Sequence, residues 1–147
     1  MDRWRGGIAG GVAATITMLV LFLFAEAEAQ YRLGIGTLIA RYTRLPDAPL
    51  VSLVVFFLVG VFVWPLVYAY VGDSLTHVPY GSDPAVRGLV FGGALWIVFV
   101  FVTRPGYVGV LSILTYSFTL FAHLVYGFTL GAVTAVLSQT PTPSTPA

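Results

Sequence analysis

The sequence contains no cysteine and no lysine, and only 9% of its 147 residues carry a charge. The absence of cysteine excludes disulfides, thiolate metal sites and covalently attached haem. All seven basic residues are arginine, a bias typical of GC-rich or halophilic genomes. By contrast, 58% of the residues are apolar and the mean hydropathy is +0.91. Because a soluble domain needs more polar surface than this, the composition predicts a polytopic membrane protein.

Four apolar stretches are long enough to cross a bilayer as helices, which takes about 20 residues each. They cover residues 7–29, 50–71, 87–103 and 110–137. We therefore predict an all-α membrane protein with four transmembrane helices, forming one domain over residues 1–138. Residues 139–147 are rich in Ser, Thr and Pro, a composition that predicts a disordered tail.

The segment between the first two stretches predicts a short additional helix. From Thr37 onward, helical spacing places Thr37, Arg41 and Arg44 on one face. The other face carries the apolar side chains Leu38, Ile39, Tyr42 and Leu45. A helix with two such faces is expected to lie in the membrane interface.

Two glutamates close the first stretch. Glu26 and Glu28 are two residues apart, so they point to nearly opposite sides and at most one faces the bundle. Glu28 and Arg32 have the favourable i, i+4 order for an ion pair. We interpret Glu26, Glu28 and Arg32 as interfacial groups, together with Arg41 and Arg44; a proton-relay role for Glu26 stays an alternative.

Two short motifs recur in the same order along the chain. "RGGIAGG" at residues 5–11 matches "RGLVFGG" at 87–93, and "PLVYAY" at 65–70 matches "HLVYGF" at 123–128. We interpret the chain as two duplicated helical hairpins, about residues 1–72 and 83–138. Because each hairpin crosses twice, a pseudo-twofold axis along the membrane normal would relate them.

Glycines at four-residue spacing predict where the helices touch. The pairs are Gly6/Gly10, Gly7/Gly11, Gly88/Gly92 and Gly127/Gly131. Little hydrophobic force acts between helices in lipid, so small residues that allow close backbone approach mark helix–helix contacts. The alternative is that glycine is simply common in membrane helices.

His123 is the ionisable side chain nearest the middle of the last stretch. It shares a helical face with Thr119, Gly127 and Gly131, so we expect it to point into the bundle. Three interpretations stay open. His123 forms a structural interhelical hydrogen bond, serves as a proton or ligand site, or binds a metal or haem with Met18 as a second ligand.

The repeat aligns His123 with Pro65 and Tyr126 with Tyr68. A proline inside a helix frees a backbone carbonyl. One structural hypothesis is therefore that His123 donates a hydrogen bond to the carbonyl freed at Pro65. The two tyrosines are expected to anchor the interface or to bond between helices.

The stretches "RGLVFGGALWIVFVF" and "HLVYGFTLGAV", with the opening "AGGVAAT", carry a resemblance that covers nearly the whole chain. In these residues the sequence resembles an uncharacterised family of small four-helix integral membrane proteins of halophilic archaea. The resemblance implies a prokaryotic cell membrane as the setting and transfers no functional residues.

No catalytic set, phosphate loop, metal-ligand cluster or nucleic-acid-binding pattern is evident in the sequence. We therefore expect a protein that is not an enzyme, has no cofactor and does not bind nucleic acid. The leading prediction is an accessory or assembly subunit of a larger membrane complex, such as a respiratory one. The alternatives are a small transporter or ligand-binding bundle for a proton, quinone or lipid that uses His123, and a haem-binding protein.

The expected partners are the lipid bilayer and other membrane-protein subunits, with self-association also open. The count of arginines on the two sides of the membrane is nearly balanced and leans slightly towards an N-terminus outside the cell. Against this count, Arg3 and Arg5 directly precede the first stretch, and Arg32 to Arg44 can belong to the interfacial helix. We predict both termini on the cytoplasmic side.

Overall fold

The computed structural model describes residues 3–30, 33–104 and 109–138, and every regular element in these ranges is a helix. Four helical segments are long and apolar enough to cross a membrane. They are Trp4–Glu28, Pro49–Val71, Pro84–Thr103 and Val110–Ser138. The predicted all-α fold with four helices of membrane-spanning length is thus confirmed. The predicted tail, residues 139–147, lies outside the described residues.

The first, third and fourth spans are each one continuous α-helix, whereas the second is broken into three parts. The continuous helices are α1 (Arg3–Glu28), α5 (Pro84–Thr103) and α6 (Val110–Ser138). The second span consists of α3 (Pro49–Leu58), the π-helix η1 (Val59–Val63) and α4 (Trp64–Val71). The short elements are α2 (Ile35–Thr43) and the 3₁₀-helix η2 (Ser74–His77).

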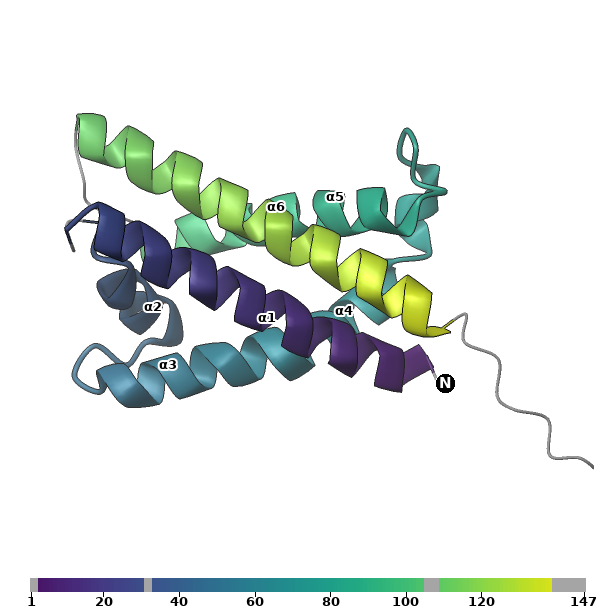
Figure 1. The fold of residues 1–147 in the computed structure, drawn as a ribbon, viewed down its shortest axis with the longest axis horizontal. Coiled ribbons are helices and arrows are strands. Elements are labelled where there is room, and N and C mark those ends of the chain that lie inside the picture. Colours follow the sequence, from purple (N-terminus) through teal and green to yellow (C-terminus); the bar gives the residue numbers. More distant parts are fainter. Residues whose placement is uncertain (1–2, 31–32, 105–108, 139–147) are drawn as a thin grey trace, which may run out of the picture.

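Helix α6 packs against both α1 and α5, and α1 also packs against η1 and α4 (Figure 1). The start of α1 and the end of α6 lie at the same end of the bundle (Figure 1), where a Cβ added at Gly6 would be 3.2 Å from the Ser138 hydroxyl. At this end α5 begins with Pro84, and the Asp83 side chain accepts a hydrogen bond of 2.8 Å from the Ala85 amide. This N-cap supplies an acceptor to one of the amides in the first turn of α5 that have no partner within the helix.

The close approach of α5 and α6 depends on facing glycines. A Cβ added at Gly88 would overlap the Gly127 carbonyl, and one added at Gly127 would overlap the Gly88 carbonyl. Gly92 meets the backbone of His123 in the same way, and Gly131 meets that of Pro84. The two backbones are therefore in van der Waals contact along this interface, as small-xxx-small spacing favours.

Helix α2 has the two faces that its sequence pattern predicts. Leu38 and Ile39 are buried, whereas Thr37, Arg41 and Arg44 are exposed. Tyr42 extends the buried side, with its ring centre 5.7 Å from that of Phe56 and 5.6 Å from that of Phe99. This packing fixes α2 against α3 and α5; its position in the membrane interface stays a prediction.

Candidate functional site

The break in the second span is bonded to the last helix by a tyrosine. Pro65 lacks a backbone N–H, and the π-helix Val59–Val63 directly precedes its turn. The buried Tyr126 hydroxyl donates a hydrogen bond of 2.6 Å to the Gly60 carbonyl within this π-helix. Lipid offers no hydrogen-bond donor to a backbone carbonyl that lacks its partner within a membrane-spanning helix. Tyr126 of α6 supplies this donor to Gly60.

His123 is buried, with 5% of its surface exposed, but it bonds within its own helix. Its Nδ1 lies 2.7 Å from the Thr119 carbonyl oxygen. Because a carbonyl only accepts, Nδ1 carries a proton, and Nε2 of the neutral ring is left as an acceptor. The structure therefore corrects the hypothesis that His123 serves the broken helix: the donor at the break is Tyr126, one turn further along.

A cavity of about 20 Å³ lies at the centre of the bundle beside this bond. Its lining residues come from all four spans and from α2, and they are Thr15, Met18, Tyr42, Phe56, Gly60, Trp64, Leu95, His123 and Tyr126. The volume suits about one water molecule. Met18 and His123 both line this cavity, but its volume is far smaller than that of a haem.

Metal binding has no further support in the geometry. Within residues 3–30, 33–104 and 109–138, no group of three or more His, Cys, Asp or Glu side chains could hold an ion. The second histidine, His77, is exposed in η2, where its Nδ1 lies 3.2 Å from the Ser74 carbonyl.

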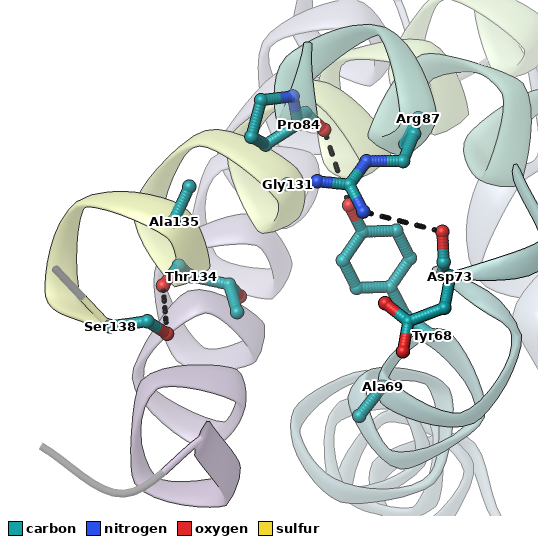
Figure 2. A pocket seen from close by; sticks show the side chains of 10 residues that line it. Tyr68, Ala69, Asp73, Pro84, Arg87, Gly131, Thr134, Ala135 and Ser138 are labelled. Atoms are coloured by element: carbon teal, nitrogen blue, oxygen red, sulfur yellow. Dashed lines mark hydrogen bonds between the residues drawn. The ribbon is translucent and has the colours of Figure 1, made fainter. Parts of the chain in front are cut away.

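A larger pocket of about 220 Å³ lies at the end of the bundle that holds the start of α1, between α4, α5 and α6. Figure 2 shows Arg87 and Asp73 on one side of this end pocket and Thr134 and Ser138 of α6 on the other. One guanidinium nitrogen of Arg87 donates to the Gly72 carbonyl at 3.4 Å. The Arg87 Nε is buried and has no hydrogen-bond partner among the described residues.

Tyr68 forms the floor of the end pocket and ties two spans together. Its hydroxyl donates a 3.2 Å hydrogen bond to the Pro84 carbonyl, and its ring centre lies 5.2 Å from that of Phe91 (Figure 2). The predicted bond between helices is therefore present for both Tyr68 and Tyr126. The sequence did not predict the end pocket, because Arg87 and Asp73 line one space only when the loop between α4 and α5 folds back.

Of the two glutamates, Glu26 faces the protein and Glu28 is exposed. The Glu26 carboxylate accepts a hydrogen bond from the Ile35 amide, the first residue of α2. A carboxylate at a helix N-terminus pairs an unsatisfied amide and complements the helix dipole. Glu26 thus positions α2 against the end of α1. The predicted ion pair of Glu28 involves Arg32, which lies outside the described residues.

Gly7 differs from the other glycines at the start of α1. A Cβ added at Gly6, Gly10 or Gly11 would meet another side chain or carbonyl within 3.4 Å. A Cβ added at Gly7 would meet nothing within 4 Å. Gly7 is buried beside Pro65 and Leu66 of α4, but it does not make the tight contact that Gly11 makes. Its role as a helix-packing residue stays a prediction.

Together, the helices and their buried polar contacts define a class: a small all-α protein with four helices of membrane-spanning length, which makes it a multi-pass membrane protein. The chain belongs to a family of unknown function, DUF6789, whose family model matches residues 1–145. Comparison with curated proteins and with solved structures gives no match.

Proposed function

We propose that the protein is a non-catalytic accessory or assembly subunit of a larger membrane complex, such as a respiratory one. The observation that carries this proposal is a small hollow of about 10 Å³ between α1 and α4, bordered by exposed Trp4 and Leu66. It is lined by Trp4, Gly7, Ile8, Pro65, Leu66 and Ala69. We call it the Gly7 groove.

The groove has the properties of a helix-docking surface. Gly7 itself is buried, but nothing lies within 4 Å of its Cβ position, and Trp4 and Leu66 beside it are more than half exposed. A glycine inside a helix costs about 1 kcal/mol relative to alanine, and at Gly7 no neighbouring atom within 4 Å of the Cβ position requires the missing side chain. A transmembrane helix of another subunit would pack on the exposed side chains of Trp4 and Leu66 and cover the small space at Gly7, since helices associate in lipid through close van der Waals packing.

The proposal is tested by purifying the tagged protein in a gentle detergent from cells that naturally produce it. We expect a stoichiometric partner subunit that is lost when Gly7→Leu fills the groove. Ala94→Leu, on the exposed face of α5, is the matched control and should keep the partner. A wild-type protein that purifies alone, or only with copies of itself, would contradict the proposal.

A small ligand-binding bundle is the second candidate, and the end pocket favours it. Arg87 and Asp73 put a cationic and an anionic group beside one space of about 220 Å³ (Figure 2). This arrangement fits a small ligand that carries both charges, such as a zwitterionic headgroup or an amino-acid-like solute. The cavity at His123 suits only a water molecule or a proton, so a quinone ring does not fit there.

The ligand proposal is tested by mass spectrometry of small molecules released from the purified protein. A zwitterionic compound should be released from the wild type and be absent from Arg87→Gln, with Arg5→Gln as the matched loss of charge at the same end. If both variants release the same compounds as the wild type, the end pocket is not the binding site.

We further propose that the chain arose by duplication, that α2 lies in the interface and that both termini face the cytoplasm of a prokaryotic cell. In support, the two "R-G-x-x-x-G-G" motifs fall in the first turns of α1 and α5. The start of α1 and the end of α6 also share one end of the bundle (Figure 1). Because the chain has no cysteine, labelling of single introduced cysteines by a membrane-impermeant maleimide tests the orientation. Labelling from outside at both ends of the chain would overturn it.

A further inference from the structure

Three arginines converge at the end of the bundle opposite the end pocket. Arg41 and Arg44 come from the last turn and the C-cap of α2, and Arg104 is the C-cap of α5. They line one open cleft of about 920 Å³, which we call the arginine cleft. Its other lining residues are Pro46, Phe101, Val102 and Thr103.

The charges in the arginine cleft come from two separate parts of the chain. All three arginines are exposed, and they are the charged residues that line the cleft. Three guanidinium groups around one space repel one another unless an anion lies among them. Convergence of like charges therefore indicates a site for an anionic group.

A simpler explanation covers only part of this arrangement. A cation near the C-terminus of a helix is favoured by the helix dipole, and one arginine on each helix would satisfy that preference. It does not account for a second arginine on α2 or for the meeting of both helix ends at one cleft. It also does not account for the backbone: Arg44 and Arg104 have φ angles of 62° and 40°, where glycine or asparagine is usual at this position.

The surroundings of the cleft identify the source of the anion. Phe101, on the last turn of α5, is 73% exposed and lies one helical turn from the bundle end. In a bilayer this side chain contacts acyl chains, while Arg104 three residues later reaches the headgroup layer. The arginines of the cleft therefore lie at the depth of a phospholipid's phosphate, and Phe101 lies at the depth of its acyl chains.

We propose that the arginine cleft binds the phosphate of an anionic phospholipid. One guanidinium group can donate hydrogen bonds to two phosphate oxygens at once. Basic clefts between transmembrane helices are known to bind anionic headgroups. Arg41, Arg44 and Arg104 surround the phosphate, and the acyl chains run along Phe101. This lipid site is independent of the Gly7 groove and of the end pocket.

The test measures lipid binding by the full chain in detergent. Native mass spectrometry follows the bound fraction on titration with phosphatidylglycerol, with phosphatidylcholine and with inorganic phosphate. We expect a clear preference for phosphatidylglycerol over phosphatidylcholine. Each Arg→Gln change at Arg41, Arg44 or Arg104 should weaken the binding of phosphatidylglycerol about fivefold, and the triple change should weaken it about a hundredfold.

Two controls separate the phosphate site from a general effect of charge or folding. Arg5→Gln removes the same charge at the other end of the bundle and should leave lipid binding within about twofold of the wild type. A triple Arg→Lys variant keeps the charge and should retain the preference at lower affinity, because an ammonium group cannot bind bidentately. It also shows that the cleft tolerates substitution.

Three results would overturn the proposal. The first is equal binding of the two lipids by the wild type, and the second is an unchanged preference in the triple Arg→Gln variant. The third is competition by inorganic phosphate at the same concentration as the lipid, which would assign the cleft to the free ion.

Discussion

The Tyr126 hydroxyl donates a 2.6 Å hydrogen bond to the Gly60 carbonyl across 66 positions of sequence. The bond joins the middle of α6 to the π-helix that interrupts the second span. Backbone groups freed inside a membrane must be satisfied by protein or trapped water. Tyr126 therefore stabilises the interrupted helix that precedes Pro65.

Replacement of Tyr126 by phenylalanine removes this donor while leaving the ring in place. We expect Tyr126→Phe to lower the free energy of unfolding by about 1 kcal/mol, the usual size of such a bond in proteins and membranes. Thermal unfolding in detergent measures the change. Tyr70→Phe is the control, because Tyr70 is 88% exposed. Equal melting temperatures for the two variants would show that the Gly60 carbonyl does not depend on Tyr126.

Glycine substitutions distinguish positions in tight contact with another helix from positions with space for a side chain. Gly88→Ala places a methyl group against the Gly127 carbonyl and forces α5 and α6 apart, so we expect a loss of several kcal/mol or failure to fold. Gly7→Ala should leave stability unchanged or raise it slightly, because its methyl group enters open space. Yield and melting temperature check both. Similar behaviour of the two variants would argue against the close α5–α6 contact.

The cap that Glu26 provides should control the order of α2. Glu26→Ala leaves the Ile35 amide without this acceptor, so amide hydrogens in the first turn of α2 should exchange faster by about tenfold. Glu26→Gln keeps an acceptor oxygen and should keep most of the protection. Hydrogen-exchange mass spectrometry of the peptide that contains the start of α2 measures this rate, with exposed Glu28→Ala as the control. If exchange is unchanged in Glu26→Ala, Glu26 does not cap α2.

The tautomer of His123 follows from its bond to the Thr119 carbonyl. We expect nitrogen NMR of histidine-labelled protein at neutral pH to show a buried histidine protonated at Nδ1 and unprotonated at Nε2. His123→Asn identifies the signal, since the chain has only two histidines. A signal protonated at Nε2 would mean that Nδ1 does not donate to Thr119.

The spacing of residue types along the sequence predicted those features of the fold that are set within a single helix. The four spans follow from apolar length, and the two faces of α2 follow from Arg41 and Arg44 opposite Leu38 and Ile39. The small-residue contacts at Gly88 and Gly127 also follow from four-residue spacing, because both partners carry the same signal.

Features that depend on packing between distant segments were not predicted. The repeat aligned His123 with Pro65 and suggested a bond between them, whereas the observed donor is Tyr126. Helix depth and side-chain reach decide that choice, and neither can be read from an alignment of two motifs. The arginine cleft likewise requires the fold to bring α2 beside the end of α5, so the spacing of Arg44 and Arg104 carried no signal.

The central claim is that another subunit docks at the Gly7 groove, and a single cysteine tests it most directly. Because the chain has no cysteine of its own, Gly7→Cys provides one attachment point that the open space tolerates. A photoreactive maleimide placed there and activated in native membranes should form an adduct with a different membrane protein, while the same probe at Ala94→Cys should not. An adduct only with lipid or with a second copy of this chain would contradict the claim.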